Sequence, residues 1–231
     1  MDNPDCPIPK KRLEELVSTR AAEDSETSPW DPSDVILFEK NAEKATATTK
    51  DLQQVAISRF EDMQHELLNH EFQQGHTLKA QPDEPAVQRW IADRLDLKKG
   101  IAYSVDREPH VADEKEPDVR LRAKASNASL PIEIKLTNPD GWTLQQLEDA
   151  LRIQLAGRYL RDRNAHHGIL LLVRQESRQK GWKDTKTNTF IDFDEVVIRL
   201  KELALEIAIA SPDAPVCEIV VLDVSSCGEA K

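Results

Sequence analysis

The chain has few of the features that mark secreted, zinc-binding or membrane-spanning proteins. Its three cysteines, Cys6, Cys217 and Cys227, lie far apart and form neither a Cys-x-x-Cys pair nor a cluster with histidine at zinc spacing. A disulfide framework is therefore not expected, and a reducing cytoplasm is the expected location. No apolar run approaches the roughly 20 residues that cross a membrane, and the start MDNPDCPIPKKR lacks the apolar core of a secretion signal. We therefore expect no membrane partner.

Charged residues are plentiful but unevenly distributed. The 231-residue chain carries a net charge of −11, which argues against general adhesion to nucleic acid. Residues 118–190, however, hold 13 Lys and Arg against 8 Asp and Glu, a surplus of +5. A polyanion can be drawn to this segment while the rest of the chain repels it. A chance excess of solvated surface charge is the alternative explanation.

The pattern of the first third of the chain differs from that of the rest. Residues 1–80 predict a helical accessory region, in which the Ser-, Asp- and Pro-rich segment 23–34 forms a linker. Residues 48–72 predict a helix, because apolar residues from Leu52 to Leu67 recur every three or four positions. This stripe is expected to pack on the main domain or on a partner helix. The acidic N-terminal helices also offer a surface for a protein partner.

Residues 81–231 predict one α/β domain. Asp83 is the expected N-cap of a helix that ends near Leu97. Thr143 begins a second long helix, to about Asp162, with Gln146 completing a capping box. The whole order is helix, three strands, helix, strand, helix, strand, with strands expected at 101–105, 118–123, 132–136, 168–173 and 216–224.

The stretch from Pro117 to Leu136 carries the chemistry. Its second strand alternates apolar residues with Glu133 and Lys135, which is the period-two pattern of a half-buried strand. Pairing with the preceding strand as a hairpin brings Asp118 close to both. Carboxylates on adjacent strands can share a divalent cation, and a lysine beside them can offset charge that builds on a phosphate. The hairpin therefore predicts a metal-dependent site for phosphodiester hydrolysis.

Each of these residues also has a simpler interpretation. Glu133 and Lys135 can form the solvated face of an ordinary strand. Glu84, in the first turn of its helix, is either stabilised by the helix dipole or a metal ligand. Gln154 and Arg158 fall on the packed face of the 143–162 helix at roughly 100° per residue, so their polar groups need a partner or a wet cleft.

Together these motifs resemble a known family. With Pro117-Asp118 followed by Glu133-Ile134-Lys135, residues 83–175 resemble the PD-(D/E)XK nucleases, which have the restriction-endonuclease-like fold. The resemblance implies a core of order α-β-β-β-α-β. In this chain a C-terminal helix and strand and a helical N-terminal extension would be added to that core.

The resemblance also implies roles for the site residues. Asp118, Glu133 and the backbone carbonyl of Ile134 would bind Mg²⁺, with Mn²⁺ as a substitute. Glu84 would join them, and Lys135 would act on the attacking water. These four side chains are the catalytic residues that the resemblance predicts.

The expected substrate is DNA. One exonuclease branch of the family carries a Gln followed four residues later by Tyr, but here Arg158 follows Gln154 and Tyr159 comes one residue late. The chain departs from that branch, so we expect Gln154, Arg158 and the basic loop around Lys183 to hold the DNA backbone. RNA or another phosphodiester is the weaker alternative. A catalytically inactive module of the same fold, which binds nucleic acid or a protein partner in a larger assembly, is the other.

Overall fold

The structure is a computed structural model that describes residues 10–26, 32, 45–69, 74–106, 116–161, 164–185 and 187–228. The chain separates into two units, residues 1–42 and 43–231. The first unit contains helix α1 (Lys10–Glu26), as its sequence predicts. Residues 23–26, which the sequence assigned to the linker at 23–34, belong to α1, and most of the rest of that linker lies outside the described residues, as do residues 107–115.

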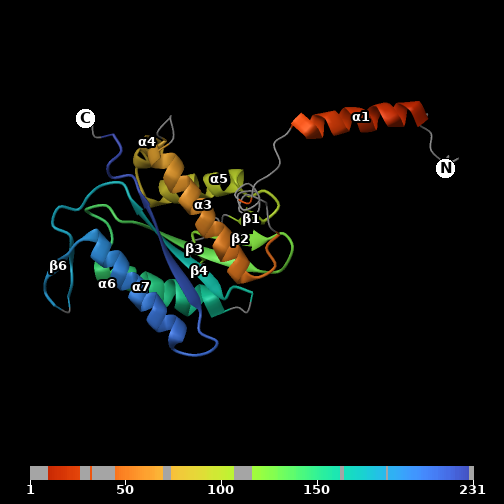
Figure 1. The fold of residues 1–231 in the computed structure, drawn as a ribbon. Coiled ribbons are helices and arrows are strands. Elements are labelled where there is room, and N and C mark those ends of the chain that lie inside the picture. The colour runs from red at the N-terminus through yellow and green to blue at the C-terminus, as the bar shows by residue number, and fades with distance from the viewer. Residues whose placement is uncertain are drawn as a thin grey trace. The chain divides into compact units, whose positions relative to one another are not determined.

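The second unit is built on a five-stranded mixed sheet of order β1-β2-β3-β4-β7 (Figure 1). Strand β2 pairs antiparallel with both β1 and β3, and β3, β4 and β7 run parallel. The prediction of a mixed α/β unit is therefore confirmed. The strands are β1 (Tyr103–Asp106), β2 (Val119–Ala123), β3 (Ser129–Leu136), β4 (His167–Arg174) and β7 (Val216–Asp223).

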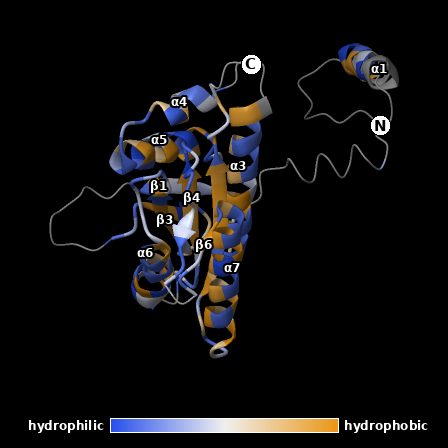
Figure 2. Cartoon of the chain, turned by 90° about the vertical axis from the view of Figure 1, so that its left-hand side faces the viewer, coloured by the Kyte–Doolittle hydropathy of each residue, from blue (hydrophilic) through white to orange (hydrophobic). Residues whose placement is uncertain are grey.

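Helices cover both faces of this sheet. One hydrophobic core joins α3 (Thr49–Asn69) and α5 (Glu84–Leu97) to the face that carries Ile132, Ile134 and Leu171. The other core joins α6 (Leu144–Asp149), the π-helical segment η1 (Ala150–Ala156) and α7 (Phe193–Ile209) to the face of Leu170 and Leu172. Figure 2 shows hydrophobic residues along the central strands and mixed with polar residues along α3 and α7, as expected of amphipathic helices.

Helix α3 belongs to the sheet-bearing unit and not to a separate accessory region. Five residues of its stripe are at most 1% exposed and lie in the core on β3, β4 and β7, namely Leu52, Ala56, Phe60, Met63 and Leu67. The side chain of Gln64 also bonds both backbone groups of Asp223 at the end of β7. The boundary between the units therefore follows Ala42, whereas the sequence placed it near residue 80, because the apolar stripe of α3 is buried against the sheet.

The predicted caps and central strand are confirmed. The Asp83 side chain accepts a hydrogen bond from the backbone N–H of Ala86 at 2.8 Å, and α5 begins at the next residue. Thr143 and Gln146 form the reciprocal capping box at the start of α6. Strand β4 is central and buried on both faces, as its apolar run predicts.

Two segments differ from their predictions. The helix expected at 143–162 is α-helical only to Asp149, continues as η1, and ends in the 3₁₀ turn η2 (Tyr159–Arg161). The segment 174–188, expected as an exposed loop, contains β5 (Trp182–Lys183), which pairs with β6 (Phe190–Ile191). Trp182 is 1% exposed because its ring packs in the core beside Phe193. The short helix α4 (Gly75–Lys79) precedes α5.

Within the described ranges, none of the helices combines the length and the apolar character needed to cross a membrane.

Candidate active site

The site lies where β2 stops pairing with β3. The paired register ends at Val119 opposite Ile132, so the next backbone groups of β3 on that side have no strand to bond. Two carboxylates take them instead. Asp118 Oδ2 accepts from the Ile134 N–H at 2.7 Å, and Glu84 Oε2 accepts from the Leu136 N–H at 2.9 Å. The edge of β3 thus fixes two acids that are 34 residues apart in the sequence.

Lys135 is the centre of this group. Its Nζ lies 2.6 Å from Glu133 Oε1, its neighbour on the same face of β3. Glu84 Oε1 is 3.6 Å away and Asp118 Oδ2 is 3.9 Å away. The side chains of Lys135 and Glu133 are each 4% exposed, so these charges interact where water screens them weakly. Three carboxylates therefore surround one buried ammonium group.

Burial and charge shift the ionisation of these groups. Burial, with the Glu133 charge added, raises the pKa of Asp118 from 3.8 to about 7, although Lys135 and the Ile134 N–H oppose the rise. Burial also raises the pKa of Glu133 against the effect of Lys135. For Lys135, burial alone lowers the pKa, but the charges of the three acids outweigh it and raise the pKa above its ordinary value. In this arrangement Lys135 is therefore a fixed positive charge at neutral pH.

Trp142 connects two members of the group. Its indole N–H donates to Glu84 Oε2 at 2.6 Å, and the Lys135 Nζ lies 4.5 Å from its ring centroid. Trp142 follows the Asn138-Pro-Asp-Gly turn after β3 and was not among the predicted site residues. No periodic pattern marks it, because it lies in a loop whose path depends on the turn.

We expect Trp142→Phe to lower the free energy of unfolding by about 1–3 kcal/mol, the range for losing a hydrogen bond to a charged group. Phenylalanine keeps an aromatic ring near Lys135 but cannot donate to Glu84. Urea denaturation at neutral pH measures the change. Trp90→Phe on α5, where Arg94 stacks on the ring, is the matched control and should cost less. An equal decrease in the free energy of unfolding for the two variants would show that the hydrogen bond from Trp142 to Glu84 does not contribute to stability.

The sequence also predicted that Gln154, Arg158 and Lys183 bind the DNA backbone, and the structure shows different surroundings for each of them. The Arg158 charge opposes the rise in the pKa of Glu133, so its guanidinium lies within electrostatic range of the site. Gln154 is half-buried, and its Oε1 is buried without a hydrogen-bond partner in the described part of the chain. Lys183 is exposed on β5, beside Trp182, whose indole N–H donates to the Trp142 carbonyl. Successive residues of a strand point to opposite faces, so the Lys183 side chain faces solvent while Trp182 is buried.

Tyr159 lies near the site although it is the fifth residue after Gln154 and not the fourth. It follows the π-helical segment η1, in which an i→i+5 bond adds one residue to a turn, and it begins the 3₁₀ turn η2. Burial, followed by the charges of Glu133 and Asp118, raises the pKa of Tyr159 to about 12, and its hydroxyl donates to the Glu116 carbonyl at 2.9 Å. Sequence reasoning missed this placement because it assumed a regular α-helix.

The donor set suits a hard divalent cation, although the side chains are now arranged around Lys135. Among the described residues, no three His, Cys, Asp or Glu side chains are grouped closely enough to hold a metal ion as they stand. Glu133 Oε2, however, is buried and has no hydrogen-bond partner in the same part of the chain. A buried carboxylate oxygen is costly unless a donor or a cation satisfies it. Carboxylate and carbonyl oxygens are the ligands that Mg²⁺ accepts.

Comparisons with known proteins found no match: no family model, no curated protein and no solved structure matches the chain. The function is therefore argued from the site itself.

Proposed function

We propose that the protein is a metal-dependent nuclease that hydrolyses DNA phosphodiester bonds. The observation that carries this proposal is the buried cluster in which Lys135 Nζ lies within 3.9 Å of Glu133, Glu84 and Asp118. Such a cluster contains both oxygen ligands for a cation and a fixed positive charge for a phosphate. The restriction-endonuclease-like topology and membership of the PD-(D/E)XK family are parts of the same proposal.

Asp118, Glu133 and the Ile134 carbonyl would hold Mg²⁺ or Mn²⁺, with Glu84 assisting. The buried Oε2 of Glu133, which has no hydrogen-bond partner among the residues that the structure describes, supports this assignment. In a strand, the N–H and C=O of one residue point to the same side, and the Ile134 N–H already faces Asp118. When bound, the metal would activate a water and polarise the phosphate.

The remaining residues would act on charge and position. Lys135 stays protonated, so it would stabilise negative charge that develops on the phosphate. Glu84 and Trp142 would hold the ammonium in place through the contacts described above. Arg158, whose charge acts on Glu133, would contact a phosphate of the DNA backbone near the site. The basic surplus of residues 118–190, with Lys183 exposed on β5, supports a polyanionic substrate.

The proposal is tested by digestion of linear, circular and single-stranded DNA, with RNA alongside, in Mg²⁺, Mn²⁺ and chelator. We expect cleavage of DNA in either metal and none in chelator. If the protein cleaves RNA and not DNA, the substrate in the proposal changes to RNA, and metal-dependent phosphodiester hydrolysis is retained. Cleavage that is unaffected by chelator would remove the metal from the proposal.

Metal binding has its own readout. We expect Mg²⁺ to raise the free energy of unfolding, by about 2.7 kcal/mol when its concentration is about 100 times Kd. Glu133→Gln should abolish the increase, because it removes a charged ligand. Glu202→Gln, which neutralises an exposed acid on α7, is the control and should retain it. A metal effect that is the same in all three proteins would place the cation elsewhere.

One observation favours the second candidate, an inactive module of the same fold that binds nucleic acid or a protein partner. Lys135 already makes ion pairs with all three acids, which compensates part of their charge without a metal. Titration calorimetry separates the two functions. The inactive module predicts no binding of a divalent cation that depends on Asp118 and Glu133.

A further inference from the structure

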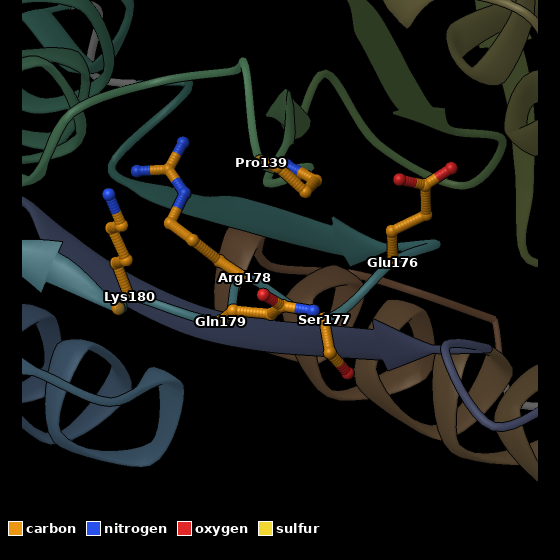
Figure 3. A pocket seen from close by; sticks show the side chains of 7 residues that line it. Pro139, Glu176, Ser177, Arg178, Gln179 and Lys180 are labelled. Atoms are coloured by element: carbon orange, nitrogen blue, oxygen red, sulfur yellow. The ribbon is translucent and has the colours of Figure 1, made fainter.

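A second basic feature lies beside the candidate site, at the carboxyl ends of the parallel strands β3 and β4. The turn after β3 and the segment 176–181 after β4 line an open hollow of about 510 Å³. Figure 3 shows Arg178 and Lys180 extending in the same direction from this segment, with Glu176 at the opposite end of the hollow. Loops at the carboxyl ends of parallel strands are common places for ligand sites.

Arg178 is held in a defined position in this hollow. Its Nη2 donates to the Asn138 carbonyl at 3.0 Å, and its guanidinium carbon lies 4.5 Å from the centroid of the Trp182 ring. Its Nε is buried without a hydrogen-bond partner among the described residues. Burial lowers the pKa of Arg178, and Asp140 opposes this, but a guanidinium stays charged in proteins. Arg178 therefore presents a fixed positive charge with donors to spare.

The hollow and the candidate site share structural residues. The Trp182 indole N–H donates to the Trp142 carbonyl at 3.1 Å. Arg178 stacks on the ring of the same Trp182. Trp142 in turn contacts Lys135 and Glu84. A chain of three contacts thus connects Arg178 to Lys135. The contacts pass through Trp182, which is 1% exposed, so the protein interior holds Arg178 in a fixed relation to Lys135.

The lining favours an anion over an apolar ligand. Sites for small molecules are mostly apolar and enclose their ligand. Here the hollow is open, and five of its seven lining residues have polar or charged side chains, the others being Pro139 and Gly181. Lys180 is exposed, so its ammonium can move to meet a ligand, whereas Arg178 is fixed. An open surface with one fixed and one movable cation suits a phosphate on a passing strand.

We infer that this hollow binds an internal backbone phosphate of the substrate strand, next to the phosphodiester that is cleaved. The inference rests on the proposed function and adds a subsite to it. Arg178 supplies the fixed donors and Lys180 the second cation. Glu176, at the far end, repels the chain of phosphates there and so limits the direction in which the strand can leave.

The test measures binding of a labelled DNA oligonucleotide with hydroxyl ends by fluorescence anisotropy, in Ca²⁺ and at several salt concentrations. Lys180→Gln should raise Kd about 3- to 10-fold and reduce the slope of log Kd against log salt by about 0.7–0.9, because one phosphate contact is lost. Lys180→Arg retains the charge and should bind like the wild type. Lys201→Gln removes an exposed lysine charge from α7 and should change neither quantity.

The outcomes separate this inference from the proposed function. Equal effects of Lys180→Gln and Lys201→Gln, in a protein that cuts DNA in Mg²⁺, would overturn the subsite and leave the nuclease intact. If Lys180→Gln weakens binding only of DNA that bears a terminal phosphate, the hollow binds a strand end, and the internal-phosphate inference is overturned. A wild-type protein that neither binds nor cuts DNA would overturn both.

Discussion

Lys135→Ala is expected to reduce DNA cleavage at saturating substrate by about 10³-fold, the upper range for removing one preorganised donor from a developing oxyanion. The reason is that the Lys135 ammonium lies within 4 Å of all three carboxylates. Its loss removes the fixed charge that would face the phosphate and leaves the acids to repel it. Single-turnover cleavage in Mg²⁺ measures the effect.

The same substitution should also affect stability, so folding and catalysis must be separated. Removing one partner of a buried ion pair costs about 3–5 kcal/mol, because the remaining charges stay buried. This loss should shrink as pH falls, since protonated carboxylates no longer need the ammonium. Lys201→Ala, on the exposed side of α7, is the control. If folded Lys135→Ala cleaves DNA as fast as the control, Lys135 has no part in the reaction.

Asp118→Asn is expected to abolish metal-dependent cleavage and yet to stabilise the protein above neutral pH. Asparagine can still accept the Ile134 N–H through its carbonyl oxygen, but it lacks the charge of a metal ligand. It also removes a buried negative charge near Glu133. Loss of activity with gain of stability is expected where charges are gathered for function.

The pH dependence follows from the sign of the shift. The pKa of Asp118 is about 7 in the folded protein and 3.8 ordinarily, so between these values the folded state binds more protons than the unfolded state. The contribution of Asp118 to stability is therefore greatest at low pH and falls as pH rises toward 7. Between about pH 5 and about pH 8, we expect the free energy of unfolding of the wild type to fall by about 2 kcal/mol or more through the ionisation of Asp118. The Asp118→Asn variant should not show this decrease.

Urea denaturation of wild type and Asp118→Asn at about pH 5 and about pH 8 measures this difference. Asp213→Asn, in an exposed turn, controls for the change in net charge. Parallel pH profiles for wild type and Asp118→Asn would show that Asp118 ionises normally. Retention of Mg²⁺-dependent cleavage by Asp118→Asn would remove this residue from the metal site.

Local sequence predicted those parts that short-range physics decides. Alternation around Glu133 and Lys135 predicted a strand, the apolar run after Gly168 predicted the buried strand β4, and Asp83 predicted the start of α5. Each signal comes from side-chain periodicity or from a cap within one turn, and these do not depend on distant residues. The apolar stripe of α3 was equally clear, but its packing partner was not.

The tertiary structure decided where the pairing of β2 with β3 ends and which side chains bond the backbone of β3 beyond that point. Because pairing ends at Val119, the free N–H groups of β3 bind Asp118 and Glu84, and so place two distant acids on Lys135. The π-helical segment η1, which precedes Tyr159, has no local pattern that predicts it. By itself the sequence determined the five strands of the main sheet, the helix caps and the charged residues on one strand face, but not the short pair β5 and β6. Only the packed sheet determined which of those charges meet, because unpaired backbone groups and loop contacts involve residues far apart in the chain.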